Sequence, residues 1–253
     1  MLAPERHQRI LHLLTAQGSV RTIDLARLLK VTEETIRRDL EKLDHEGRLI
    51  RTHGGAIREA ENRRDLPLTS REAMNIAEKQ SIARQALTAI DAGQTILLDA
   101  STTAFELATL LPNIELTILT NGLKTALELA KRPAAQVVLV GGSVSAASLA
   151  CVGPLSDQIL ASHNIQKAFL SCRGIDIDRG LSEANEQHAH LHSHMIALSQ
   201  EVYLLADHSK LGLKSSYFFA KLADIDFLIT NRKPIRDFAK AIRQAGVELQ
   251  ITS

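Results

Sequence analysis

The chain has 253 residues, of which 45% are hydrophobic, so it can hold one large domain or a small and a medium-sized one, and wholesale disorder is excluded. Its net charge of +1 excludes the strongly basic composition that would by itself indicate a nucleic-acid partner. The longest apolar runs are only strand-length, and no secretory leader precedes Pro4, so a cytoplasmic protein with no membrane span is expected. Without an export signal, Cys151 and Cys172 are expected to be buried thiols rather than a disulfide.

The first 58 residues are expected to form a small helical domain. Apolar residues at helical spacing predict a helix from Pro4 to Gln17, which Gly18 stops. A second helix is predicted in "VRTIDLARLLK", with Thr22 as its N-cap. The apolar side chains that this helix offers for burial are Ile23, Leu25, Leu28 and Leu29.

A third helix and a hairpin follow in "VTEETIRRDLEKLDHEGRLIRTHGGAI". Thr32 fits the N-cap of this helix, and Ile36, Leu40 and Leu43 form its inward stripe. The segment "RLIRTHGGAI" predicts two short strands joined by a turn at Gly54–Gly55. Three helices followed by a hairpin predict a winged helix-turn-helix, in which the third helix reads DNA.

In a winged helix-turn-helix, the outward side chains near the start of the third helix form the hydrogen bonds to bases and phosphates. An ordinary three-helix bundle with solvated charges is the alternative at this point. The DNA-binding residues that we expect are Thr32, Glu34, Thr35, Arg37 and Arg38 in the helix, with Arg51 and His53 in the wing.

The pattern changes after a polar linker, residues 59–72. Residues 73–253 are expected to form an α/β domain, because short β-rich runs alternate with helical segments, a pattern typical of a parallel sheet covered on both faces. The runs are "QTILLDA", "LTILTNG", "QVVLVGG", "KAFLSCRG", "EVYLLAD" and "DFLIT". The helices are predicted at Thr103–Leu111, Leu123–Lys131 and Asn185–Leu198.

Eight short motifs, in this order, resemble those of the DeoR family of bacterial transcriptional regulators. They are "R-x-x-x-I" at Arg6–Ile10, "TEETIRRDL" at Thr32–Leu40, "HGGAI", "LDASTT" at Leu98–Thr103, "LTN" at Leu119–Asn121, "LVGG" at Leu139–Gly142, "GID" at Gly174–Asp176 and "ADHSKLG" at Ala206–Gly212. The resemblance covers nearly the whole chain. It implies a DNA-binding head and a sensor domain that resembles the ribose-5-phosphate isomerase fold and binds a phosphorylated sugar.

The residues themselves agree with an anion site at the strand ends. Ser101, Thr102 and Thr103 would lie at a helix N-terminus, where free N–H groups favour an anion. Open α/β sheets bind ligands at the carboxyl ends of their strands. The remaining effector-binding residues that we expect are Asp99 for sugar hydroxyls, Asn121, Gly141 and Gly142 at strand ends, Arg173, and Lys210 as a cation. Taken singly, "STT" as a capping turn and Lys210 as a solvated lysine remain alternatives.

The sequence lacks the motifs of several enzyme classes. "GGSVS" lacks the second glycine of a hydrolase nucleophile elbow, and the sequence contains no P-loop and no G-x-G-x-x-G motif. An isomerase with an appended DNA-binding head is the rival hypothesis, and it needs a carboxylate base. Gly174 stands where that acid is expected, although Asp176 and Asp178 are nearby. Arg173 is interpreted either as a specificity contact or as a surface arginine.

The stretch "HAHLHSHM" raises the question of a metal. On a helix, His188 and His192 form one i,i+4 pair, and His190 and His194 form another on roughly the opposite face. The four rings therefore cannot converge, although one pair with a third ligand still could chelate an ion. We interpret them as partly exposed helix histidines and predict no metal site and no cofactor.

Together these features predict a transcriptional regulator, a repressor rather than an activator, of a carbohydrate catabolic operon. Its expected partners are double-stranded operator DNA, a phosphorylated sugar effector and further copies of itself, as a homodimer or homotetramer.

Overall fold

The computed structural model describes residues 2–45, 48–52, 54–57 and 67–252. They divide into two compact units, Met1–Arg64 and Asp65–Ser253. No helix in this described part of the chain is long and apolar enough to cross a lipid bilayer.

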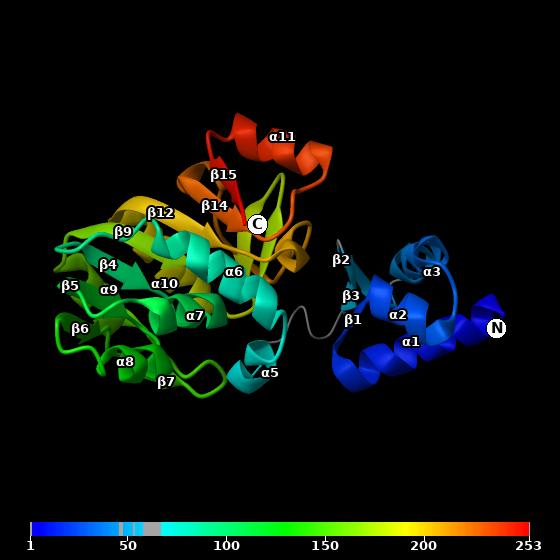
Figure 1. Cartoon of the computed structure of the whole chain (residues 1–253), viewed down its shortest axis with the longest axis horizontal. Helices are drawn as coiled ribbons and strands as arrows, with labels where there is room; N and C mark the ends of the chain where they lie inside the picture. Colours follow the sequence, from blue (N-terminus) through cyan, green and yellow to red (C-terminus); the bar gives the residue numbers. More distant parts are fainter. Residues whose placement is uncertain (1, 46–47, 53, 58–66, 253) are drawn as a thin grey trace. The chain divides into compact units, whose positions relative to one another are not determined.

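The first unit is a winged helix-turn-helix, as the sequence predicts (Figure 1). Its elements are α1 (Ala3–Gln17), β1 (Ser19–Arg21), α2 (Thr22–Leu29), α3 (Glu33–His45), β2 (Ile50–Thr52) and β3 (Gly55–Ile57). The predicted hairpin is β2–β3, and β1, which the sequence analysis missed, completes an antiparallel sheet of order β1-β3-β2. Gly55 is needed where β3 crosses β1, because a Cβ there would lie 1.8 Å from the carbonyl oxygen of Val20.

The core of this unit follows the predicted stripes in α1 and α3 but only half of the stripe in α2. Ile10, Leu14, Ile36, Leu40 and Leu43 are buried, as are Leu25 and Leu29. Ile23 and Leu28 are 41% and 58% exposed, because this short helix turns only one face to the core. Thr22 is not the N-cap: helix α2 begins at Thr22 itself, and its N-cap, Arg21, makes no side-chain cap bond.

A buried ion pair ties α1 to α3. Asp39 accepts hydrogen bonds from Arg6, whose Nη2 lies 3.0 Å from Asp39 Oδ1. The same Oδ1 lies 2.9 Å from Nε2 of His7. The side chains of Arg6 and Asp39 are only 10% and 8% exposed. Burial by itself would raise the pKa of Asp39, but the bonds from Arg6 and His7 hold it below its usual value. The acid in "TIRRDL" is therefore part of the core.

We predict that Asp39→Asn destabilises the first unit by roughly 3–5 kcal/mol, because it leaves the buried guanidinium of Arg6 without its counter-charge. The control is Glu41→Gln on the same helix, whose side chain is 69% exposed and should matter little. Hydrogen exchange of the α1 and α3 amides in the full-length protein measures both effects. Equal losses in the two variants would contradict the prediction.

The same contact has a pH dependence with a definite sign. A depressed carboxyl pKa contributes stability above the unfolded value, about 3.9, and that stability is lost as pH falls through the folded value. The α1 and α3 amides of the wild type should therefore lose protection below about pH 4.

The second unit is built on a seven-stranded sheet in which every strand is parallel to its neighbours, as predicted. The order is β15-β14-β12-β9-β4-β5-β6. The strands are β4 (Thr95–Leu98), β5 (Leu116–Thr120), β6 (Ala135–Leu139), β9 (Ile165–Leu170), β12 (Ser199–Leu205), β14 (Phe227–Thr230) and β15 (Glu248–Ile251). All six predicted apolar runs are strands of this sheet.

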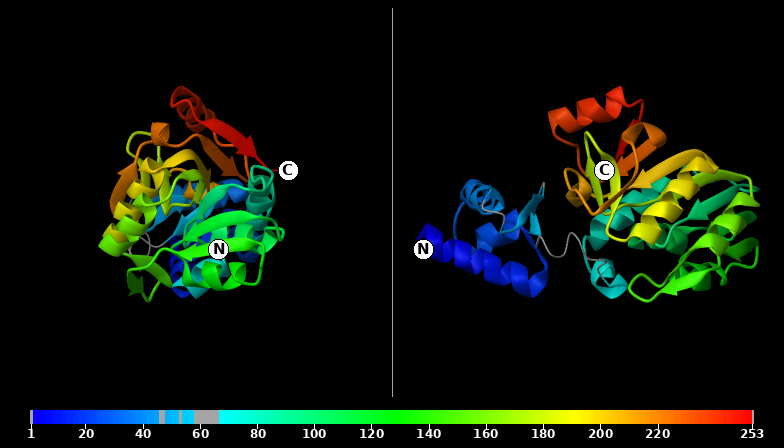
Figure 2. Two further views of the ribbon diagram at one scale, coloured as in Figure 1. Left: turned by 90° about the vertical axis from the view of Figure 1, so that its left-hand side faces the viewer. Right: turned by 180° about the vertical axis from the view of Figure 1, so that it is seen from behind.

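Helices cover both faces of the sheet, since its strands are apolar on both sides. Figure 1 views it from the side of α6 (Ile76–Leu87), α7 (Thr102–Leu110) and α8 (Leu123–Leu129). The right-hand view of Figure 2 shows the other face, with α9 (Pro154–Ala161) and α10 (Glu186–Ala197); α11 (Arg236–Gln244) also packs there. Strand β4 shows the alternation: Ile96 and Leu98 join the core under α6 and α7, whereas Leu97 joins the one under α9 and α10.

Smaller elements complete this unit. The short strands are β7 (Ser143–Ser145) with β8 (Ala150–Val152), and β10 (Gly174–Asp176) with β11 (Gly180–Glu183) and β13 (Tyr217–Ala220); two 3₁₀ turns lie at His208–Lys210 and Leu222–Asp224. Part of the expected linker, residues 59–66, lies outside the described residues. Its last residues belong to the second unit: α5 (Leu68–Glu72) has its first residue buried, with the N–H of Leu68 donating to the carbonyl of Ala147. Both cysteines are free and buried, as expected.

Candidate functional site

The expected DNA-reading side chains project from the solvent face of α3. Arg37 and Arg38 are 55% and 78% exposed, and each is held by acids one turn earlier. Arg37 lies 3.2 Å from Glu33 and 3.4 Å from Glu34, while Arg38 lies 3.4 Å from Glu34. Exposed pairs of this kind contribute little to stability, so a phosphate or a guanine edge can replace the acids.

The start of α3 is fixed by a threonine pair. The hydroxyl of Thr32 accepts the N–H of Thr35 and lies 2.9 Å from the Thr35 hydroxyl, which confirms Thr32 as the helix cap. In the wing, Arg51 is 40% exposed and lies 3.6 Å from Glu41 on α3. The other expected wing contact, His53, lies outside the described residues.

In the second unit, the strand order places a topological switch between β4 and β9. From β4 the chain moves outward through β5 to β6, then returns to β9 and continues through β12 to β15. Connections leave in opposite directions from such a pair of strands, and the crevice at their carboxyl ends is where open α/β sheets bind ligands. Asp99 follows β4 and Arg173 follows β9, so these two expected site residues flank the switch.

Asp99 holds this switch together. Its Oδ1 accepts the N–H of Ser101 at 3.0 Å, and its Oδ2 accepts the N–H of Ser171 at 2.8 Å and lies 3.4 Å from Nε2 of His192 on α10. The residue has no exposed surface. Burial by itself would raise the pKa of Asp99, but the contacts with His192, Ser101 and Ser171 keep it below the usual range. Its geometry is therefore that of a structural support for the loop, rather than of a carboxylate open to solvent.

The "STT" turn is both a cap and an anion-binding candidate. The side chain of Ser101 caps α7 by accepting the N–H of Ala104 at 3.1 Å. Thr102 and Thr103 are the first two residues of that helix, so their N–H groups have no intrahelical acceptor. Both side chains are buried, and the helix start offers its partial positive charge at the switch.

Four cationic side chains, Lys79, Lys210, Arg71 and Arg173, lie close enough for their charges to act on one another. Burial lowers the pKa of Lys210, which was expected from the sequence, although the negative charge of Asp207 acts in the opposite direction. Lys79 on α6 is 5% exposed, and burial, together with the charges of Lys210 and Arg71, lowers its pKa to about 8. Arg173 is close enough to Lys210 for its charge to lower the pKa of that lysine. Lys79 is buried and the other three are half-buried, and such a concentration of positive charge is suited to a doubly charged anion.

Two further groups, the buried His192 and the half-buried Glu183, were not expected from the sequence as effector-binding residues. Nδ1 of His192 lies 3.8 Å from Oε1 of Glu183. Burial raises the pKa of that glutamate. Burial opposes protonation of His192, but the contacts with Asp99 and Glu183 raise its pKa above the ordinary value. The interpretation of all four histidines as partly exposed was wrong for His192 and for His188, which is buried with its Nε2 2.9 Å from the hydroxyl of Ser148.

The expected residues after β5 and β6 have a different environment. Asn121 is 1% exposed and donates from Nδ2 to the carbonyl of Cys151 on β8. Gly142 has a φ of +129°, and a Cβ there would lie 2.5 Å from the carbonyl of Val152. A Cβ on Gly141 would contact α9. The contacts of these three residues are therefore with the β7–β8 hairpin and α9.

The candidate acids of the isomerase hypothesis lie in the β10–β11 hairpin. Asp176 accepts the N–H groups of Asp178 and Arg179 and lies 3.1 Å from Lys214. A side chain at Gly174 would meet the backbone of Leu213 at 2.5 Å, so this backbone leaves no space for an acid there. Asp178 is exposed beyond the strand.

A winged helix-turn-helix joined to a parallel α/β unit defines the class of two-domain DNA-binding regulators. Residues 6–62 match the DeoR-like helix-turn-helix domain, and residues 74–232 match the DeoR C-terminal sensor domain. The chain belongs to the DeoR family of transcriptional regulators.

Relatives of similar length support this assignment. The chain is 42% identical to the uncharacterized HTH-type transcriptional regulator YulB of Bacillus subtilis, over 91% of this chain and 90% of that protein. It is 34% identical to the HTH-type transcriptional repressor GlcR of Bacillus subtilis, over 100% of this chain and 97% of the relative. A ribose 5-phosphate isomerase A structure from Methanocaldococcus jannaschii is 16% identical over 54% of this chain and 55% of its own, with a TM-score of 0.41, too distant to indicate a shared activity.

Proposed function

We propose that this regulator represses a carbohydrate operon and that a phosphorylated sugar, bound at the β4–β9 switch, changes its affinity for operator DNA. The observation that carries the proposal is the cluster of four cationic side chains, with Lys79 buried, in the unit whose helix α7 begins at the carboxyl end of β4. Lys79, Lys210, Arg71 and Arg173 supply the charge, and Thr102 and Thr103 supply the N–H groups. A phosphate carries about −1.5 to −2 charges at neutral pH and three strong acceptor oxygens, which fit both features.

In this proposal the remaining polar groups recognise the sugar. His192 and Glu183 line the opposite side of the switch from α7 and offer a donor and an acceptor to hydroxyl groups. Asn121, Gly141 and Gly142 act less directly, by fixing the loops after β5 and β6. Repression is supported by the named function of GlcR, a relative matched along the whole chain.

The DNA side of the proposal assigns base and phosphate contacts to the start of α3 and the wing. Thr32, Thr35, Arg37 and Arg38 would enter the major groove, Glu34 would accept from a base amino group, and Arg51 and His53 would contact the backbone. We further propose that residues 73–253 assemble the chain as a homodimer or homotetramer, because paired heads read half-sites related by symmetry.

The prediction for the head is that Arg37→Ala and Arg38→Ala weaken binding to an operator selected from a random double-stranded pool. A base-reading arginine should cost ~1–3 kcal/mol and relax specificity, whereas a phosphate contact should weaken all sequences alike and reduce the salt slope by about one. Arg9→Ala on α1 is the control. Unchanged operator affinity in both α3 variants would remove these arginines from the interface.

The prediction for the effector site uses a carboxylate placed where the phosphate should bind. Thr102→Glu at the first position of α7 should abolish the response of the operator complex to sugar phosphates while DNA binding persists. Thr109→Glu, at an exposed position in the last turn of the same helix, should respond as the wild type does. Titration of candidate sugar phosphates against the complex measures this. A full response in Thr102→Glu would refute the phosphate site, and turnover of a sugar would favour the isomerase hypothesis.

The low pKa of Lys79 gives a third prediction. Its charge is lost as pH rises through about 8, so affinity for a sugar phosphate should fall over that range in the wild type. In Lys79→Gln the affinity should be lower by roughly tenfold or more, and the fall near pH 8 should be absent. Lys131→Gln, at a 70% exposed position, is the control. Calorimetric titration at several pH values decides: an identical pH profile in Lys79→Gln would exclude this lysine.

A further inference from the structure

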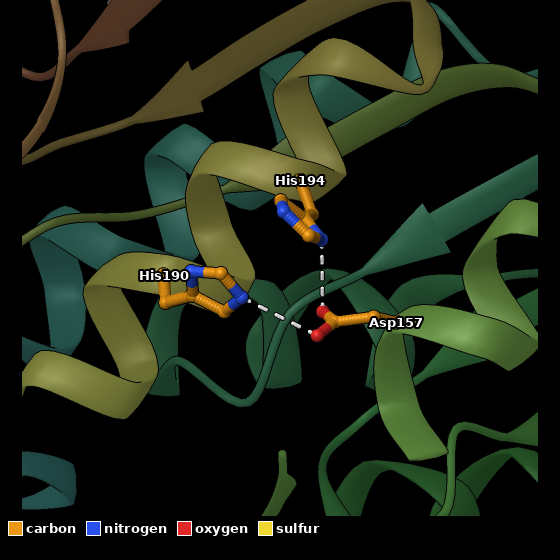
Figure 3. Close-up of side chains that lie close together, drawn as sticks. All are labelled: Asp157, His190 and His194. Atoms are coloured by element: carbon orange, nitrogen blue, oxygen red, sulfur yellow. Dashed lines mark ion pairs between the residues drawn. The ribbon is translucent and has the colours of Figure 1, made fainter. Parts of the chain in front are cut away.

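The outer face of α10 carries a convergent set of metal-ligating side chains that the proposed function does not use. His190 and His194, one turn apart on α10, both point toward Asp157 on α9 (Figure 3). Among the described residues this is the one group of three or more His, Cys, Asp or Glu donors whose ligating atoms all lie within 4.8 Å of one another. The helical spacing of the two histidines is visible in the sequence, whereas the third member comes from a different helix and has no local sequence signal.

The distances within the group are those of ligands around a small cation. Nε2 of His190 lies 3.3 Å from Oδ2 of Asp157, and Nδ1 of His194 lies 3.0 Å from Oδ1. Two donors that each lie 2.0–2.1 Å from a tetrahedral zinc ion are about 3.3 Å apart. Little movement is therefore needed for the three donors to share one ion.

The carboxylate has an unmet requirement that an ion would satisfy. Oδ1 of Asp157 is buried and accepts no hydrogen bond from any described residue, although Nδ1 of His194 is only 3.0 Å away, so the close approach lacks hydrogen-bond geometry. A buried acceptor without a donor is unfavourable. The two imidazole rings also lie close together, with centroids 4.3 Å apart, and two charged rings at that separation would repel each other. Neutral imidazoles instead offer lone pairs to a cation.

We propose that Asp157, His190 and His194 bind a divalent transition-metal ion, zinc in particular, that ties α9 to α10. Two imidazoles and one carboxylate are a donor set suited to zinc and unsuited to calcium or magnesium, which take oxygen ligands. His190 and His194 are 59% and 43% exposed, so an ion can enter from solvent and complete its coordination with water.

The test uses full-length protein without a histidine tag, stripped with EDTA and dialysed. Calorimetry with Zn²⁺ should show one ion per chain, and Co²⁺ should give the visible absorption of a four- or five-coordinate site. His190→Ala and His194→Ala should each weaken Zn²⁺ binding at least about tenfold. Asp157→Asn, which keeps the shape of the side chain but removes its charge, should weaken it too.

The matched control is His12→Ala, which removes an exposed histidine from α1 and should bind Zn²⁺ as the wild type does. Thermal unfolding gives an independent readout, since an ion that binds only the folded state raises the melting temperature with concentration in the wild type and in His12→Ala. The rise should be absent in the His190→Ala/His194→Ala double variant. One tightly bound ion that persists in this double variant, or wild-type binding no tighter than that of the double variant, would overturn the proposal.

Discussion

The second unit depends on one buried carboxylate, Asp99. A carboxylate without exposed surface is tolerated only where hydrogen bonds replace its hydration. Asp99 meets this condition with the backbone of Ser101 after β4, the backbone of Ser171 after β9 and the ring of His192 on α10. These contacts fix the start of α7, the two central strands and the helix below them in one geometry. The carboxyl ends of the two central strands are thus held in one arrangement by contacts within the chain, so little ordering entropy would oppose binding of a ligand there.

The first unit uses the same physics for a different purpose. Asp39, buried against Arg6 and His7, fixes α3 relative to α1, while the exposed arginines of α3 are held only by neighbouring glutamates. A buried pair is costly to break, whereas the exposed pairs cost little. The recognition helix therefore has a rigid position and replaceable surface contacts, which is the combination that a DNA-reading element requires.

Much of the fold was predictable from local pattern, and the exceptions have identifiable causes. The apolar periods of α3 and the six β-rich runs locate their elements because burial alone decides them. The short strand β1 has too few residues for a period, and Ile23 and Leu28 of α2 show that an apolar residue in a short helix need not be buried. At the proposed site, Asp99, Ser101 and Lys210 could be placed near strand ends from the sequence, and their roles there stay predictions. Lys79 and Glu183 escaped, and His192 was taken for a partly exposed histidine, because their proposed roles arise from contacts between elements distant in sequence.

Helix α10 joins the two proposed binding sites of the second unit. His192 faces inward to Asp99 and Glu183 at the switch, and His190 and His194 face outward to Asp157 on α9. A ligand at the inner face and an ion at the outer face would thus act on opposite sides of one helix. By thermodynamic linkage, any change that the ion makes in effector affinity must equal the change that the effector makes in ion affinity. Where two sites are coupled, this coupling free energy is typically ~1–3 kcal/mol. The same rule governs DNA: an effector alters operator binding only by the difference in its affinity for the DNA-competent and the DNA-incompetent arrangements.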